Sequence, residues 1–99
     1  MRLYQLAHAR TGDKGNLVTI SLIAYHAADF ELLAERVTAE RVAAHFRGIA
    51  EGPVLRYSLP QLGTLNFVLR RPLTQSVTRS LALDAHGKCL GSALLAMEV

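Results

Sequence analysis

The densest group of polar residues lies in residues 8–16, HARTGDKGN. Gly12 and Gly15 allow successive backbone N–H groups to turn inward and form a nest that binds an anion. Arg10 and Lys14 would add positive charge to that nest. The segment therefore predicts a site for an anionic ligand. The candidate ligand-binding residues in it are Arg10, Thr11, Gly12, Asp13, Lys14, Gly15 and Asn16.

His8 and Asp13 are the candidate catalytic residues of the same segment. A general base at His8 would need a substrate and an orienting partner within reach, and Asp13 is the nearest acid in the sequence. The alternative is a tight turn between strands, in which Asp13 and Asn16 satisfy their own backbone. The pattern is neither a Walker A motif nor a calcium loop, because it lacks the Lys-Ser/Thr ending of the first and the acidic ligands of the second.

Asn66 is a further candidate, because it interrupts an apolar stretch between Leu65 and Phe67. A buried amide needs hydrogen-bond partners for its donors and its acceptor. Two interpretations stay open for Asn66: it holds a loop in place, or it points at a ligand.

Other kinds of site find little support. The single cysteine excludes a cysteine-held iron–sulfur cluster, and His26, His45 and His86 lack metal-ligand spacing. We therefore expect no metal and no cofactor. Eleven Lys and Arg against eight Asp and Glu give a net charge of +3. These basic residues are scattered rather than clustered in a stripe, which argues against nucleic-acid binding.

Length and hydropathy indicate one small domain. The chain has 99 residues, of which 51% are hydrophobic, and it has no apolar run long enough to cross a membrane. We expect a single domain over residues 1–99, a cytoplasmic location and no membrane contact. A domain of this size buries only about 60–65% of its unfolded surface, so we expect stability that is modest or shared with a partner.

The remaining elements follow from hydrophobic periodicity and turn residues. Residues 10–16 predict a loop, and residues 28–49 predict two helices, capped by Asp29 and Thr38. Residues 62–70 predict a short helix, because apolar residues recur there at helical spacing. The predicted strands are residues 2–9, 17–24, 54–59, 77–84 and 88–97.

This order of elements predicts an α+β sandwich, with helices on one face of a mainly antiparallel sheet. The last two strands would form a hairpin around residues 85–87. The other sheet face carries Thr19 and Ser21 and is semi-polar, so it faces solvent or a second protein.

Several motifs resemble one known family. Residues 8–16 resemble the signature HARSGDKGN, with Thr11 in place of Ser. Softer matches follow at Leu59-Pro60, at residues 65–69, and at residues 80–84 with Gly87-Lys88. The family is the small ferredoxin-like domain of acyclic terpene utilisation protein A, found at its C-terminus or as a separate short chain. The resemblance implies a ferredoxin-like topology without iron–sulfur, and an association with a larger partner in acyl-CoA or terpenoid-acid breakdown.

Three functional hypotheses follow, and they leave open whether the chain is an enzyme. The first is an accessory subunit or domain that docks on the larger partner and contributes the glycine-rich loop to a shared site. The second is a self-contained module that binds or transforms an anionic metabolite, such as a CoA thioester or a carboxylate. The third is a homo-oligomeric structural protein that pairs through the strand expected at residues 88–97. Homo-oligomerisation is compatible with all three.

Overall fold

The computed structural model describes residues 1–14, 16–47, 50–70 and 89–99. Four strands form one sheet: β1 (Ala7–Lys14), β2 (Leu17–Ala24), β3 (Glu51–Leu59) and β4 (Thr64–Arg70). Three helices accompany the sheet: α1 (Phe30–Arg36), α2 (Ala39–His45) and α4 (Cys89–Leu95). Short 3-10 turns lie at η1 (Leu3–Gln5), η2 (Ala27–Asp29) and η3 (Pro60–Leu62). The predicted strand at residues 77–84 and the turn at residues 85–87 lie outside the described residues.

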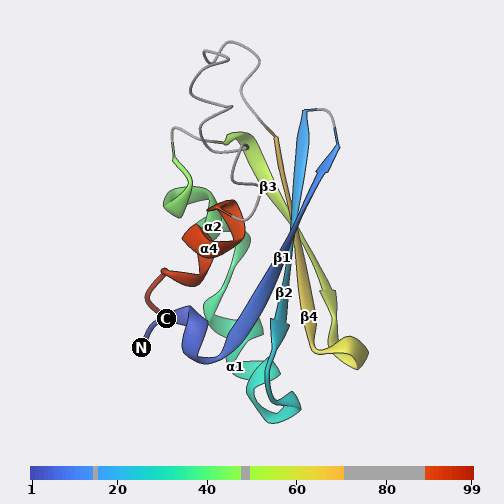
Figure 1. Ribbon diagram of the computed structural model, residues 1–99, viewed down its shortest axis with the longest axis vertical. Helices are drawn as coiled ribbons and strands as arrows, with labels where there is room; N and C mark the ends of the chain where they lie inside the picture. Colours follow the sequence, from blue (N-terminus) through green and yellow to red (C-terminus); the bar gives the residue numbers. More distant parts are fainter. Residues whose placement is uncertain (15, 48–49, 71–88) are drawn as a thin grey trace.

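The strand order is β1-β2-β4-β3, and every neighbouring pair is antiparallel. All described helices lie on one side of this sheet (Figure 1). The predicted α+β fold, a mainly antiparallel sheet with helices on one face, is therefore confirmed.

The core lies between the sheet and the helices. Strands β2 and β4 supply alternate residues to it, with Ile20, Leu22 and Phe67 fully buried. The helices meet them with Leu33 of α1, Val42 of α2 and Leu94 of α4, all likewise buried. Since β2 and β4 are the two central strands, their inward side chains are covered from every side, and the alternation of their sequences is retained.

The two predicted helices form within residues 28–49, and their caps differ. Thr38 caps α2 as predicted, because its Oγ1 accepts a hydrogen bond of 3.1 Å from the Arg41 backbone N–H. The prediction for Asp29 was wrong: its side chain makes no capping bond, and its backbone is already helical (φ −89°, ψ −5°) because η2 leads directly into α1.

The C-terminus of α1 has a stabilising contact that the sequence did not suggest. Arg56 of β3 points toward the helices and donates from Nη1 to the carbonyls of Ala34 and Val37, at 2.6 and 3.0 Å. These carbonyls have no partner inside the helix, and a guanidinium is favourable at the negative end of the helix dipole.

The prediction of a loop at residues 10–16 was wrong. Strand β1 continues to Lys14, which is opposite Leu17, so only two residues connect β1 to β2. Cross-strand pairing with β2 holds this polar segment extended, although its composition is typical of turns.

The prediction of a helix at residues 62–70 was also wrong. Residues Thr64–Arg70 form β4, with Leu65, Phe67 and Leu69 buried in alternation. Leu65 and Leu69 fit helical spacing and strand spacing equally well. The strand wins because β4 is central and pairs on both edges, and because Gly63 (φ 59°) ends η3 just before it.

The prediction of a strand at residues 88–97 was wrong as well. Residues Cys89–Leu95 form α4, and Leu90, Leu94 and Met97 are buried at helical spacing. The helix covers β1 and β2, which gives this apolar segment a place in the core. Because this segment is a helix and not a strand, two copies cannot pair through it as sheet edges.

Candidate functional site

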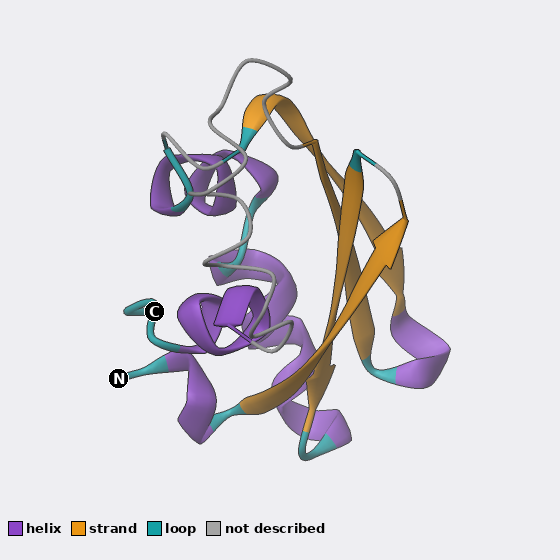
Figure 2. Cartoon of the chain, turned by 45° about the horizontal axis from the view of Figure 1, so that its top comes forward, coloured by secondary structure: helices purple, strands orange, loops and turns teal. Residues whose placement is uncertain are grey.

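The side of the sheet away from the helices is a surface built from all four strands, and no described element covers it (Figure 2). We call it the outer face. Because side chains alternate along a strand and paired residues share a side, the register fixes its members. By backbone position they are His8, Arg10, Gly12, Lys14, Leu17, Thr19, Ser21, Ile23, Glu51, Leu55, Tyr57, Leu59, Thr64, Asn66, Val68 and Arg70.

A polar row crosses the middle of the outer face. Arg10 is opposite Ser21, Ser21 is opposite Asn66, and Asn66 is opposite Tyr57. The Ser21 hydroxyl donates a hydrogen bond of 2.7 Å to Asn66 Oδ1. This contact fixes the amide, whose nitrogen supplies two further donors. We call these four residues the polar row.

The polar row answers part of the question about Asn66. Among the described residues, its half-buried side chain contacts Ser21 and so links β2 and β4. Arg10, a second predicted site residue, shares the row. Tyr57 was not predicted, although the alternation of residues 54–59 places it opposite to the buried Val54.

His8 and Asp13 occupy separate places along β1. His8 is exposed on the outer face and stacks on Tyr25, with ring centroids 5.3 Å apart and an interplanar angle of 27°. Asp13 is opposite Val18, five residues further along the strand, which is a backbone separation of about 17 Å. Their spacing in the sequence therefore does not make them neighbours.

Thr11 points to the helical side of the sheet. Its Oγ1 accepts a hydrogen bond of 3.1 Å from the backbone N–H of Gly91 in α4. Gly91 is the third residue of that helix, so its N–H has no partner inside the helix. Thr11 therefore caps α4 from β1, and any ligand role for its hydroxyl stays a prediction.

Gly12 lies on the outer face, where β1 and β2 approach closely. A Cβ at this position would lie 2.6 Å from Thr19 Oγ1, too near for any side chain. Glycine is needed here because of a neighbouring side chain.

Lys14 is opposite Leu17 at the end of the hairpin, and Asn16 is exposed in the turn. Gly15 lies outside the described residues.

The site as described is rich in hydrogen-bond donors. No group of three or more His, Cys, Asp and Glu side chains that could hold a metal occurs among the described residues. None of the helices described is long and apolar enough to cross a membrane. The polar row can bind and orient an oxygen-rich group through Arg10, Asn66 and Tyr57.

Comparison with known proteins gives one match. The family model described as the AtuA ferredoxin-like domain matches residues 1–99, the whole chain. No curated protein and no solved structure was found to match.

Proposed function

Because the chain belongs to the AtuA ferredoxin-like domain family, and so to a type of domain that forms part of acyclic terpene utilisation proteins, we propose that it is an accessory subunit or domain of a larger AtuA-type protein. Its outer face docks on that protein, and the polar row completes a site that the two share. The first of the three hypotheses assigned this shared site to a glycine-rich loop. Because residues 10–14 belong to β1, the polar row is now the part of the chain that we assign to the site.

The observation that carries this proposal is the polar row on a face that no described element covers. Exposed apolar side chains flank its Tyr57 end on β3: Leu55 is 48% exposed and Leu59 37%, and Tyr57 itself is 53% exposed. A contiguous apolar patch with a few ordered polar groups is typical of a protein interface. An isolated domain gains nothing by keeping these side chains in water, whereas burial against a partner would stabilise both chains.

The chemistry of the row suits binding more than proton transfer. Arg10 offers a guanidinium that can hold a carboxylate or phosphate in a bidentate contact. Asn66 and Tyr57 add neutral donors on the same line across the sheet. In the complex, these groups would orient a substrate or a loop of the larger protein, while that protein supplies the acid and base.

A binding experiment with the larger AtuA-type protein tests the proposal. We expect the two to form a stable complex, measured by size exclusion with light scattering at micromolar concentration. Arg10→Ala should leave the complex intact and weaken its affinity for an anionic substrate. Arg36→Ala, on the exposed surface of α1, is the matched control and should change neither. Separate elution of the wild-type chains would contradict docking.

The same row supports a second candidate, a self-contained module for an anionic metabolite such as a CoA thioester or a carboxylate. The observation in its favour is Arg10, exposed and in line with the Asn66 amide. A thermal-shift screen of the isolated chain against CoA, short acyl-CoAs and dicarboxylates tests it. Ligand at 100 times its dissociation constant adds about 2.7 kcal/mol, a shift of several degrees that Arg10→Ala should abolish. A flat screen would exclude these ligands.

A further inference from the structure

Ser21 lies within the polar row, between Arg10 on β1 and Asn66 on β4. Its hydroxyl donates the hydrogen bond of 2.7 Å to Asn66 Oδ1. Because the oxygen and the nitrogen of an amide branch in different directions from the same carbon, this bond turns Nδ2 and its two N–H donors away from Ser21. Ser21 thereby determines which end of the Asn66 amide a ligand on the outer face meets.

The small size of Ser21 matters as well. Neighbouring strands are about 4.8 Å apart, so the backbones of Arg10 and Asn66 are separated by about 10 Å across β2. Only a short side chain stands between them, which leaves room above Ser21 for a group that both side chains contact. Arg10 is exposed, and its long side chain can reach such a group from the side of β1.

Arg10 is the only fully charged member of the polar row, and this single charge favours one class of ligand. The other Arg, Lys and Glu of the outer face are Lys14, Glu51 and Arg70, which lie together in its last row, about 13 Å from the polar row along β1 and β4. A carboxylate carries one negative charge, and its two oxygens only accept hydrogen bonds. A phosphate monoester carries about −1.5 to −2 charges at pH 7, more than one guanidinium neutralises.

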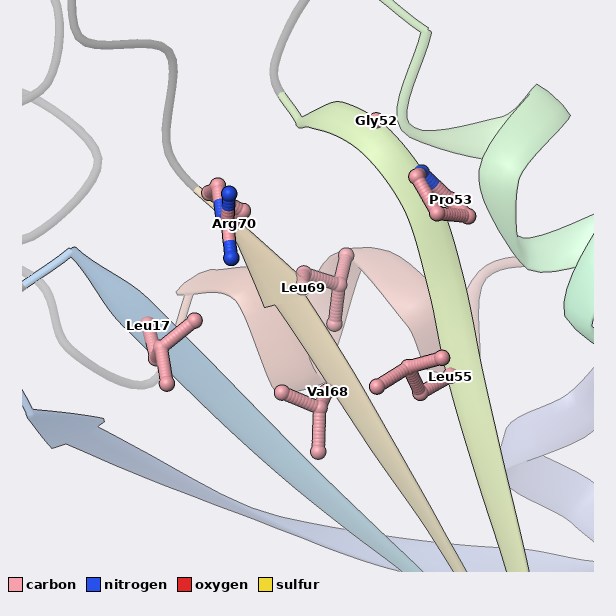
Figure 3. A pocket seen from close by; sticks show the side chains of 7 residues that line it. All are labelled: Leu17, Gly52, Pro53, Leu55, Val68, Leu69 and Arg70. Carbon is pink, nitrogen blue, oxygen red and sulfur yellow. The ribbon is translucent and has the colours of Figure 1, made fainter.

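Apolar side chains border the polar row on both sides. Leu55 and Val68 lie opposite each other on one side, where both line an open hollow (Figure 3). Ile23 and Leu59 belong to the row on the other side. These side chains form no hydrogen bonds, and they lower the local dielectric constant, which strengthens the hydrogen bonds of the polar row.

We propose that Ser21 is a positioning residue, which turns the Asn66 amide so that the polar row binds a carboxylate and rejects the neutral amide of the same shape. This inference rests on the proposed function, in which the polar row completes a ligand site. Arg10 pairs with one carboxylate oxygen, and Asn66 Nδ2 donates to the other. A primary amide in the same place would bring its own N–H donors against those of Asn66 and would offer Arg10 no charge. The carboxylate comes from a substrate or from an acidic side chain of the larger protein, and the test distinguishes the two.

Ligand-observed NMR titrations with butyrate and butyramide test the inference, on the chain alone and on its complex with the larger AtuA-type protein. The wild type should bind butyrate about tenfold or more tightly than butyramide, because only butyrate makes charged hydrogen bonds with Arg10. Ser21→Ala removes the bond that orients Asn66, so this ratio should fall by about threefold or more. Ser21→Thr keeps the hydroxyl and should keep the ratio. Thr19→Ala removes an exposed hydroxyl from the neighbouring row of β2 and is the matched control.

A purely structural role for Ser21 would give a different result. Ser21→Ala would then lower the Tm and weaken both ligands equally, and the unchanged ratio would overturn the inference. A wild-type preference for butyramide would also overturn it, because Asn66 would then present its oxygen to the ligand. If neither probe binds the chain or the complex, the polar row binds no carboxylate and the inference fails, while a stable complex would still support docking.

The larger protein separates the two sources of the carboxylate. If the complex binds butyrate with the same dependence on Ser21, the polar row binds the carboxylate of a substrate. If the larger protein displaces butyrate from the chain, one of its acidic side chains occupies the row. If the wild-type chains form no complex, the proposed docking fails, and the ratio measured on the chain alone still decides the role of Ser21.

Discussion

Replacing Thr11 by valine tests the most specific contact between the two ends of the described chain. The Thr11 hydroxyl accepts a hydrogen bond from the Gly91 N–H at the start of α4. Valine has the same shape and a strong preference for strands, so β-propensity alone predicts a variant as stable as the wild type or more so. The hydrogen bond predicts the opposite sign.

The magnitude follows from the surroundings of Gly91. This residue is buried, so without Thr11 Oγ1 its N–H loses its partner and has no access to water. A buried donor without a partner costs about 1–3 kcal/mol, and loss of a helix cap costs about 0.5–2 kcal/mol. We therefore expect Thr11→Val to lower the free energy of unfolding by about 1–2 kcal/mol, with a fall in Tm of about 4–8 °C per kcal/mol.

Urea and thermal unfolding followed by circular dichroism provide the assay, and amide hydrogen exchange at Gly91 gives a local readout. Thr11→Ser keeps the hydroxyl and should lose less than about 1 kcal/mol, because only a half-buried methyl group is removed. Thr19→Val makes the same substitution at an exposed position of β2 and should stay within about 0.5 kcal/mol of the wild type. If Thr11→Val matches or exceeds the wild type while Gly91 stays protected, the cap contributes nothing and the reasoning is refuted.

Three further predictions concern single contacts. In a Thr19→Ala background, where strand propensity acts alone, Gly12→Ala should raise the free energy of unfolding by about 0.5–1 kcal/mol. In the wild-type background this gain should disappear, because the new Cβ would lie 2.6 Å from Thr19 Oγ1. Equal effects of Gly12→Ala in the two backgrounds, measured by urea titration, would contradict this. Arg56→Gln should destabilise the protein by about 1–2 kcal/mol, since two carbonyls of α1 lose a charged donor; unchanged urea midpoints would count against it. A hydrogen bond from the Met1 ammonium lowers the pKa of the Glu98 carboxyl. The contact therefore stabilises the fold slightly at pH values above the ordinary carboxyl pKa, and this stabilisation is lost as the pH falls through the lowered pKa. An NMR titration in which Glu98 shows the ordinary carboxyl pKa would refute this.

The sequence was most informative where local chemistry and tertiary packing agree. Residues 17–24 are apolar on nearly both faces, as expected of a central strand, and they form β2 over the predicted range. Thr38 caps α2 because a hydroxyl before a helix has one local partner wherever the helix packs. Both features depend on neighbours in the sequence, and the fold class follows from such features together.

The errors occurred where tertiary contacts override local preference. Apolar residues in 62–70 fit either period, and only the place of β4 between two strands decides for a strand. The glycine in α4 weakens helix propensity, yet Gly91 is needed because a Cβ there would lie 2.7 Å from Thr11 Oγ1. That requirement involves residues 80 positions apart, and hydrophobic periodicity cannot reveal it.

The sequence singled out two members of the polar row but not their arrangement, and their ligand-binding role stays a prediction. Arg10 and Asn66 were identified as unusual polar residues, and the register brings both to the polar row. Tyr57 was missed, because a residue's face within a sheet depends on which strands flank it. The dense motif at residues 8–16 combines two roles: His8 and Arg10 face outward, whereas Thr11 holds α4.

The contact between α4 and β1 also constrains the order in which the chain folds. The β1–β2 hairpin joins neighbouring residues and can form early, since short loops close at low entropic cost. The buried Leu90, Leu94 and Met97 complete the core from the other end of the sequence. During synthesis, α4 therefore cannot cover the inner side of β1 until residues 89–97 have left the ribosome, and the many long-range contacts predict slow folding for so short a domain. Within the cell, this domain is most exposed to aggregation and proteolysis in that interval.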